Sequence, residues 1–147
     1  MPITDKPVAV TGASGFIASH IVQLLLTAGY RVRGTVRDAS KSADVAHLTG
    51  LVGASDRLEL VSANLLDASA FDHVVSGCDY VLHTASPYAI DVKDPQRDLV
   101  DPAVKGTRNV LDACARSGSV KRVVLTSSMA AITDEPESDR ALTEADW

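Results

Sequence analysis

The strongest constraint on this sequence is a glycine-rich turn that lies between a short apolar segment and an apolar helical pattern. Residues 7–11 are typical of a buried strand, and residues 16–28 carry apolar side chains at helical spacing. In the turn between them, Gly12 permits a tight reversal and Gly15 permits close approach of the backbone to a ligand. The helix begins with free N–H groups and a positive dipole end, which together favour a phosphate. The turn therefore predicts a dinucleotide site, with a merely tight turn as the alternative.

The rest of the chain alternates between strand-like and helix-like segments. On the helix that follows the glycine turn, one face is expected to be apolar, and it is formed by Ile17, Ile21, Leu24, Leu25 and Ala28. The alternation predicts an α/β fold with a doubly wound parallel sheet, in which ligands bind at the carboxyl ends of the strands. Strands are expected at 7–11, 31–36, 58–61, 80–83 and 122–126, helices at 16–28, 40–48, 68–75 and 96–117, and a loop at 50–56. Ser40 is the expected cap of the helix at 40–48.

Composition limits the class of protein. The chain has 147 residues, of which 46% are hydrophobic, so one domain with a buried core is expected. No apolar run reaches the roughly 20 residues of a membrane span, and the first residues lack the layout of a signal peptide. Cys78 and Cys114 have no partner at metal or redox spacing, and the histidines are scattered. We therefore expect buried thiols, no metal site and a cytoplasmic location.

The net charge of −5 comes from the end of the sequence. Segment 134–147 holds six acidic residues and one arginine, whereas acidic and basic residues balance over 1–133. No basic patch for nucleic acid and no basic amphipathic stretch for a membrane surface is present, so neither partner is expected. The chain is accordingly divided into a nucleotide-binding domain at 1–133 and an acidic loop at 134–147.

The residue that ends the second expected strand indicates which dinucleotide binds. An acidic residue at this place would bond the ribose hydroxyls of NAD and repel a 2′-phosphate. The residue here is Arg37, whose guanidinium can pair with that phosphate, and Lys41 adds a second positive charge. Asp38 is a counter-signal because its carboxylate could reach a ribose, and Arg37 could also be a solvated surface residue. The pattern favours NADP over NAD as the cofactor.

Five stretches of the sequence carry a family resemblance. Together they resemble the extended short-chain dehydrogenase/reductases, in particular the dihydroflavonol 4-reductase-like branch with its cinnamoyl-CoA reductases and yeast-type methylglyoxal and ketone reductases. The resemblance implies a Rossmann domain, NADPH as the cofactor, and reduction of an aldehyde or ketone to an alcohol. The stretches are TGASGFIA at 11–18, GTVRD at 34–38, VLHTASPY at 81–88, DPAVKGTRNVLDAC at 101–114 and VKRVVLTSSMAAI at 120–132.

The resemblance also implies roles for individual residues. Ser128 is the implied catalytic residue, because a hydroxyl at this place can hydrogen-bond a substrate carbonyl; the alternative is that Ser127 and Ser128 only cap the following turn. Asn64 stands where the family usually has an aspartate, and it can still bond an adenine amine. The residues expected at the cofactor are Gly12, Ser14, Gly15, Phe16, Ile17, Arg37, Lys41, Asn64, Leu65, Thr84, Ala85, Ser86 and Ser127.

The family's proton donor, a tyrosine followed four residues later by a lysine, has no match in this sequence. All three tyrosines precede Ser128 and lack that lysine, and no tyrosine or lysine follows Lys121. We therefore expect the N-terminal portion of a reductase, inactive alone and incomplete on the C-terminal side of the fold, with a complete small protein as the alternative. A non-catalytic, redox-sensing NADP-binding module and a nucleotide-sugar epimerase of the same fold are the competing functions. The resemblance further implies a homodimer that forms through the helix at 96–117.

Overall fold

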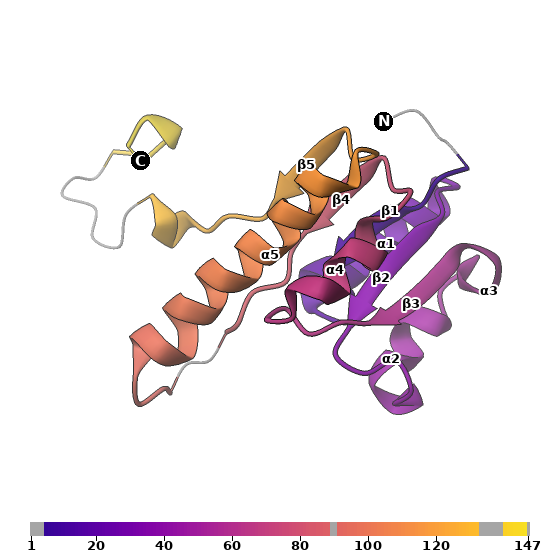
Figure 1. The fold of residues 1–147 in the computed structure, drawn as a ribbon, viewed down its shortest axis with the longest axis horizontal. Helices are drawn as coiled ribbons and strands as arrows, with labels where there is room; N and C mark the ends of the chain where they lie inside the picture. The colour runs from indigo at the N-terminus through magenta and orange to yellow at the C-terminus, as the bar shows by residue number, and fades with distance from the viewer. Residues whose placement is uncertain (1–4, 89–90, 133–139, 147) are drawn as a thin grey trace.

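The computed structural model describes residues 5–88, 91–132 and 140–146, and its five strands form one parallel sheet in the order β3-β2-β1-β4-β5 (Figure 1). The chain winds outward from β1 to β3 and then returns to β4 on the other side of β1, which confirms the predicted doubly wound sheet. The strands are β1 (Val8–Thr11), β2 (Val32–Val36), β3 (Leu58–Ser62), β4 (Tyr80–His83) and β5 (Arg122–Leu125). The helices are α1 (Phe16–Thr27), α2 (Ser42–Thr49), α3 (Ala54–Arg57), α4 (Ala68–Val75) and α5 (Asp101–Ser117), with the short elements η1 (Gln96–Val100), η2 (Met129–Ala131) and η3 (Glu144–Asp146).

The two faces of the sheet are covered by separate groups of helices, each with its own core. Because successive side chains of a strand point to opposite faces, Val8 and Val10 of β1 join one core and Ala9 joins the other. Helices α1 and α2 pack on the face of Val8 and Val10. Helices α4 and α5 lie side by side on the other face, where Phe71 and Val110 surround Ala9 (Figure 1). The strand that carries the glycine turn is therefore buried on both sides.

Helix α1 faces the sheet with only part of the apolar face that the sequence predicts: Leu25 is buried and Ile21 packs against the core, as expected. Ile17 and Leu24, expected inside, are 56% and 69% exposed. The helix is apolar on several sides, so its own pattern does not select the face that packs. The small side chain of Ala18, buried just after the glycine turn, brings the helix close to the sheet and sets its rotation. The residues that face the core are Ala18, Val22, Leu25 and Leu26.

Three local expectations are also corrected. The segment 50–56, expected as a loop, contains the start of α3. Ser40, expected to cap α2, lies ahead of that helix and donates its hydroxyl to Asp38 instead. The long helix begins as the π-helical element η1 and continues as α5. This change occurs just before Pro102, whose missing N–H removes one α-helical hydrogen bond.

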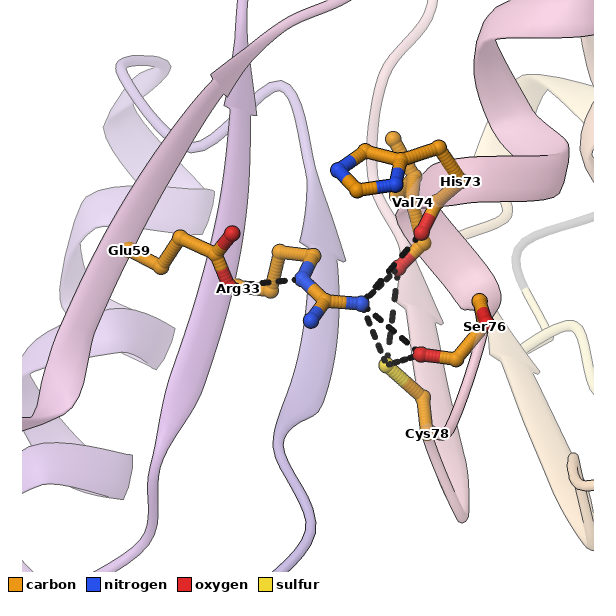
Figure 2. A network of polar contacts seen from close by, with 6 residues as sticks. All are labelled: Arg33, Glu59, His73, Val74, Ser76 and Cys78. Carbon is orange, nitrogen blue, oxygen red and sulfur yellow. Dashed lines mark hydrogen bonds and ion pairs between the residues drawn. The ribbon is translucent and has the colours of Figure 1, made fainter.

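Arg33 ties β2 to the carboxyl end of α4 (Figure 2). Its Nη1 donates to three carbonyl oxygens at that helix end, those of His73 at 3.3 Å, Val74 at 3.1 Å and Ser76 at 2.8 Å. Its Nε donates to Glu59 on β3 at 2.8 Å. A cation at this end of a helix satisfies carbonyl groups that have no partner within the helix. The contact therefore fixes α4 against β2 and β3.

Asp79 joins three strands at the amino-terminal edge of the sheet. Its buried carboxylate accepts from Lys121 Nζ at 2.9 Å and from Lys6 Nζ at 3.1 Å, and these two residues precede β5 and β1. The Lys121 ammonium, followed by that of Lys6, holds the pKa of the Asp79 carboxyl below its usual value. This ion cluster stabilises the edge of the sheet that lies away from the candidate site.

Apolar side chains are uncovered along η1, α5 and β5. Val100, Val104 and Leu111 lie on one side of the continuous helix and are 46%, 48% and 39% exposed. β5 is the last strand of the sheet, and its Val124 and Leu125 are each 49% exposed. The amino-terminal part of α5 extends past the sheet in Figure 1. These surfaces are the part of the fold that is available for further packing.

The acidic C-terminal segment is described only over 140–146. There, Arg140 pairs with Asp146, whose carboxylate also accepts the N–H of Thr143 at 2.8 Å. Residues 133–139, which include four of the six acids of the segment, lie outside the described residues. The division into a domain at 1–133 and an acidic loop at 134–147 stays a prediction.

Candidate functional site

A cleft of about 590 Å³ lies at the carboxyl ends of the strands, where the sequence predicts a ligand. The glycine turn after β1, the end of β2, the loop after β3, the turn after β4 and residues 98–102 at the start of the long helix all line it. Segments that are distant in the sequence therefore converge at the switch point between β1 and β4. The predicted cofactor residues that the cleft brings together are Gly12, Ser14, Gly15, Arg37, Asn64, Leu65, Thr84, Ala85 and Ser86.

The glycine turn after β1 has the shape of a phosphate cradle. Gly12 has a φ of 67°, a conformation that favours glycine, and its carbonyl accepts the N–H of Gly15 at 2.9 Å. A Cβ on Gly12 would lie 3.1 Å from Ala85 in the turn after β4, and a Cβ on Gly15 would lie 3.2 Å from the Gly12 oxygen. Gly15 is also the N-cap residue of α1 and has no side chain that could cap the helix. The N–H groups at the start of α1 therefore face an open cradle.

Thr11 holds the glycine turn beside the turn that follows β4. Its buried Oγ1 accepts the N–H groups of Thr84 and Ala85, each at 3.1 Å, and lies 2.7 Å from His83 Nδ1. The Thr84 hydroxyl donates in return to the carbonyl of Thr11. This role of Thr11 was not predicted from the sequence, although a hydroxyl residue that ends a buried strand is a signal that could have indicated it.

The hydrogen bonds of Thr11 decide the tautomer of His83. A hydroxyl has one proton and two lone pairs, and the N–H groups of Thr84 and Ala85 occupy both lone pairs of Thr11 Oγ1. The Thr11 proton is therefore donated to His83 Nδ1, and the ring proton sits on Nε2, which donates to Thr107 Oγ1 at 3.3 Å. Burial lowers the pKa of the His83 imidazole, so the ring is neutral at pH 7.

A second hollow of about 450 Å³ continues from the cleft past the end of β2. The exposed side chains of Arg37 and Lys41 supply its positive charge. Asp38 also reaches it, but its Oδ1 accepts the hydroxyl of Ser40 at 2.6 Å and the N–H of Ser40 at 2.9 Å, which lower the pKa of the carboxyl. The hollow is lined by Ser14, Val36, Arg37, Asp38, Lys41, Asp44 and Val45.

The loop after β3 forms the wall of the cleft on the side of Arg37. It starts beside β2, because the N–H of Ala63 donates to the carbonyl of Val36 at 2.9 Å. Asn64 Oδ1 accepts the N–H of Leu66 at 2.9 Å, so the amide nitrogen of Asn64 is the part of this side chain with unused donors. Such a donor suits a ring nitrogen of adenine better than the amine that the sequence analysis considered.

Four of the predicted residues line neither the cleft nor the second hollow. Phe16 and Ile17 lie on the first turn of α1 and are 81% and 56% exposed. Ser127 and Ser128 are exposed after β5. Ser128 is the N-cap residue of η2, and its Oγ accepts the N–H of Ala130 at 3.2 Å. The hydroxyl therefore has the capping role considered as the alternative, while its own proton stays available to a further acceptor.

Thr35 of β2 is a second residue that the sequence analysis missed. Its Oγ1 accepts the N–H of Gly12 at 3.0 Å, and its carbonyl accepts the N–H of Ala13 at 2.7 Å. The glycine turn is thus held from β2 by Thr35 and from β4 by the partners of Thr11. Both threonines are buried, and Thr35 is also among the residues that line the cleft.

The described part of the chain was also compared with the requirements of a metal site, a disulfide and a membrane span. Across residues 5–88, 91–132 and 140–146, no group of three histidine, cysteine, aspartate or glutamate side chains lies together. Cys78 and Cys114 are free and buried, as predicted, and burial raises the pKa of the Cys114 thiol to about 11. No helix in the same ranges is long and apolar enough to cross a bilayer.

Residues 8–146 match the NAD dependent epimerase/dehydratase family. The chain is 56% identical over 142 residues to a cinnamoyl-CoA reductase of Medicago truncatula, covering 95% of this chain and 44% of that protein. It is 40% identical over 141 residues to a dihydroflavonol 4-reductase of Hordeum vulgare, covering 96% of this chain and 40% of that protein. The chain thus spans less than half the length of these relatives.

Two solved structures show the same arrangement of elements. A yeast methylglyoxal/isovaleraldehyde reductase, complexed with NADPH, superposes with a TM-score of 0.77 and 41% identity, over 87% of this chain and 39% of that one. Vestitone reductase from alfalfa (Medicago sativa) superposes with a TM-score of 0.70 and 36% identity, over 86% of this chain and 37% of that one. These similarities confirm the predicted Rossmann fold and the resemblance to reductases of the extended short-chain type.

We expect the free energy of unfolding to fall as the pH drops below about 6.5, the ordinary pKa of histidine. The folded chain keeps His83 neutral while the unfolded chain takes up a proton, so acid favours unfolding. His83→Gln, which keeps a donor toward Thr107 and cannot titrate, should flatten the slope between about pH 7 and 5. Urea unfolding at several pH values measures this slope, with His47→Gln on the exposed surface of α2 as the control. Equal slopes for His83→Gln and the unmodified chain would contradict the assignment.

Proposed function

The chain belongs to the NAD dependent epimerase/dehydratase family, and we propose that it is the cofactor-binding portion of an NADPH-dependent oxidoreductase that reduces an aldehyde or ketone to an alcohol. The observation that carries the proposal is one cleft into which the glycine cradle, the cationic end of β2 and the turn after β4 converge. The reductases to which the chain is similar, one of them complexed with NADPH, support this choice.

The residues of the cleft fit a dinucleotide. The cradle keeps its close packing because Gly12 and Gly15 lack a Cβ, which would lie 3.1 Å from Ala85 or 3.2 Å from the Gly12 oxygen, and the N–H groups at the start of α1 would hold the oxygens of a pyrophosphate. With the 2′-phosphate at Arg37, the adenosine half would lie toward β2 and β3 and the nicotinamide half toward β4 and β5. When bound, NADPH would supply the hydride that reduces the carbonyl.

The charges at the end of β2 support NADP over NAD. Within the described ranges, Arg37 forms no ion pair, whereas the structural cations Arg33 and Lys121 are each paired with an acid. An unpaired guanidinium beside Lys41 in the second hollow suits a 2′-phosphate. Asp38, which could bond a ribose hydroxyl, is already engaged by both donors of Ser40.

Ser128 is the residue of this chain that we assign to the reacting carbonyl. It follows β5, on the nicotinamide side of the cleft, and its capping bond from Ala130 fixes the orientation of Oγ. Because that bond uses a lone pair, the O–H can donate to a carbonyl oxygen and stabilise the negative charge that forms there. The proton for the product alcohol requires a donor other than Ser128, and no tyrosine-lysine pair follows it in this sequence.

Two alternative functions, a nucleotide-sugar epimerase and a redox-sensing module, can be distinguished from a reductase. A nucleotide-sugar epimerase of the same fold retains NAD, and the unpaired Arg37 argues against it because an acidic residue at the end of β2 would suit NAD better. A redox-sensing module would bind NADP without turning over a carbonyl. Activity of the full-length protein toward aldehydes and ketones separates the sensor from the reductase.

Arg37→Ala should reduce the preference for NADPH over NADH. The loss of a charge-assisted contact to the 2′-phosphate corresponds to about 1.5–3 kcal/mol, or roughly 10- to 150-fold in the ratio of the two dissociation constants. Fluorescence titration of both nucleotides measures this ratio. Arg31→Ala, an exposed arginine just before the other end of β2, is the control and should leave the ratio unchanged. Tighter binding of NADH than NADPH by the unmodified chain would rule out the NADP assignment.

Ser128→Ala in the full-length reductase should lower turnover by about 10²–10³, the effect of removing one oxyanion donor, with little change in NADPH affinity. NADPH oxidation with several aldehydes and ketones provides the assay, and the 147-residue chain alone should show no turnover because it lacks the tyrosine-lysine pair. Ser127→Ala is the companion variant. A larger loss for Ser127→Ala than for Ser128→Ala would reverse the assignment within the pair.

We also propose that the exposed face of the long helix, formed by Val100, Val104 and Leu111, pairs with the same face of a second copy of the chain. Light scattering of the 147-residue chain should then give the mass of a dimer or larger species. Val104→Glu should shift the mass toward that of the monomer, whereas Lys105→Glu, on the neighbouring side of the helix, should not. A monomer at high concentration would refute this pairing.

A further inference from the structure

Leu65, in the cleft wall on the side of Arg37, is seated against Gly106 of α5. A Cβ on Gly106 would lie 2.3 Å from Leu65 Cγ and 2.5 Å from Leu65 Cδ2, so no other residue fits at position 106 unless Leu65 moves. Gly106 is buried in the middle of α5, where glycine lowers helix stability relative to alanine. Glycine at position 106 therefore lowers the stability of α5, but it leaves the space that the side chain of Leu65 occupies in the cleft wall.

The same turn of α5 holds the backbone of Leu65. Asn109 Nδ2 donates to the carbonyl of Leu65 at 3.0 Å, from a half-buried position one turn after Gly106. Two independent contacts, one steric and one polar, thus set the place of the loop after β3. Leu65 itself lines the cleft.

Between these two residues, Thr107 reaches the opposite wall. Its Oγ1 accepts from His83 Nε2 at 3.3 Å, and His83 is in turn bonded to the Thr11 hydroxyl that holds the N–H groups of Thr84 and Ala85. Thr84 and Ala85 line the cleft on the side of β4. One helical turn is therefore linked to both walls, directly to that of Leu65 and through His83 and Thr11 to that of Thr84 and Ala85.

We propose that Gly106, Thr107 and Asn109 of α5 form a positioning turn that sets the spacing between the two walls of the cleft and thereby its affinity for the dinucleotide. Gly106 and Asn109 position the wall that would contact the adenosine half. Thr107 positions the wall that would contact the nicotinamide half. This inference rests on the proposed function, since it takes NADPH as the ligand of the cleft.

The test uses two ligands, NADPH and 2′,5′-ADP, which is the adenosine half of NADPH without nicotinamide. Dissociation constants for the 147-residue chain and its variants are measured by calorimetry, with thermal melting in the same buffer to record stability. If the unmodified chain binds neither ligand, the proposed function itself fails, and the variants are not needed to decide it. Binding of both ligands by the unmodified chain allows the positioning turn to be tested separately.

Gly106→Ala should raise the dissociation constants of both ligands about tenfold, because the added Cβ overpacks against Leu65 and displaces it. In a Leu65→Ala background the same substitution should have no further effect on binding, since the clashing side chain has been removed. Asn109→Asp, which keeps the shape of the side chain but removes the donor, should weaken 2′,5′-ADP by about 3- to 10-fold. This second variant tests the same wall if Gly106→Ala does not fold.

Thr107→Val should raise the dissociation constant of NADPH by about 3- to 10-fold, because it acts only on the wall near β4. The dissociation constant of 2′,5′-ADP should change by less than about twofold. Thr107→Ser, which keeps the hydroxyl, should retain NADPH affinity. Arg108→Ala is the matched control, since Arg108 lies on the same turn and is exposed.

A loss of stability alone would not produce this pattern. If Thr107→Val weakens both ligands equally, or if Gly106→Ala weakens binding as much in the Leu65→Ala background as in the unmodified chain, the turn has only a structural role and the proposal is overturned. Unchanged affinities in all variants that fold would overturn it as well.

Discussion

The hydroxyl of Thr11 joins the ends of two neighbouring strands, and the shape of the cleft depends on that contact. Its oxygen is fully buried and binds two N–H groups of the turn after β4, while its proton goes to His83. In a buried place no water competes for these bonds, and an unpaired N–H there would be costly. The distance between Gly12 and Ala85 is therefore held, and the phosphate cradle and the opposite wall form one unit.

The two edges of the sheet use charge in different ways. At the amino-terminal edge, the buried Asp79 is neutralised by Lys6 and Lys121, so charge there contributes to the cohesion of three strands. At the carboxyl edge, Arg37 is exposed and forms no ion pair within the described ranges. A cation without a protein partner, close to a helix amino terminus, makes a positive region at the mouth of the cleft. This positive region at the carboxyl edge complements the negative charge of a ligand such as a dinucleotide phosphate.

Local patterns predicted most of the elements well. The bounds of α4 and β4 agree with the prediction, because short apolar runs between polar turns leave little choice of where an element begins and ends. The face of α1 was predicted only in part: Leu25 is buried as expected, whereas Ile17 and Leu24, which are as apolar, are exposed. The prediction for Ser40 failed because its hydroxyl has a nearer acceptor in Asp38 than the helix it precedes.

The sequence by itself determined the alternation of strands and helices, the glycine turn and the cation at the end of β2. These features depend on backbone conformation and on hydrophobic spacing over a few residues, so they are written in short stretches of the chain. Only the tertiary structure decided how the walls of the cleft are held. Thr11 and His83 are 72 positions apart, and Leu65 and Asn109 are 44 apart. Such pairs form only after the sheet and α5 have packed, because nothing in the local sequence of either partner specifies the other.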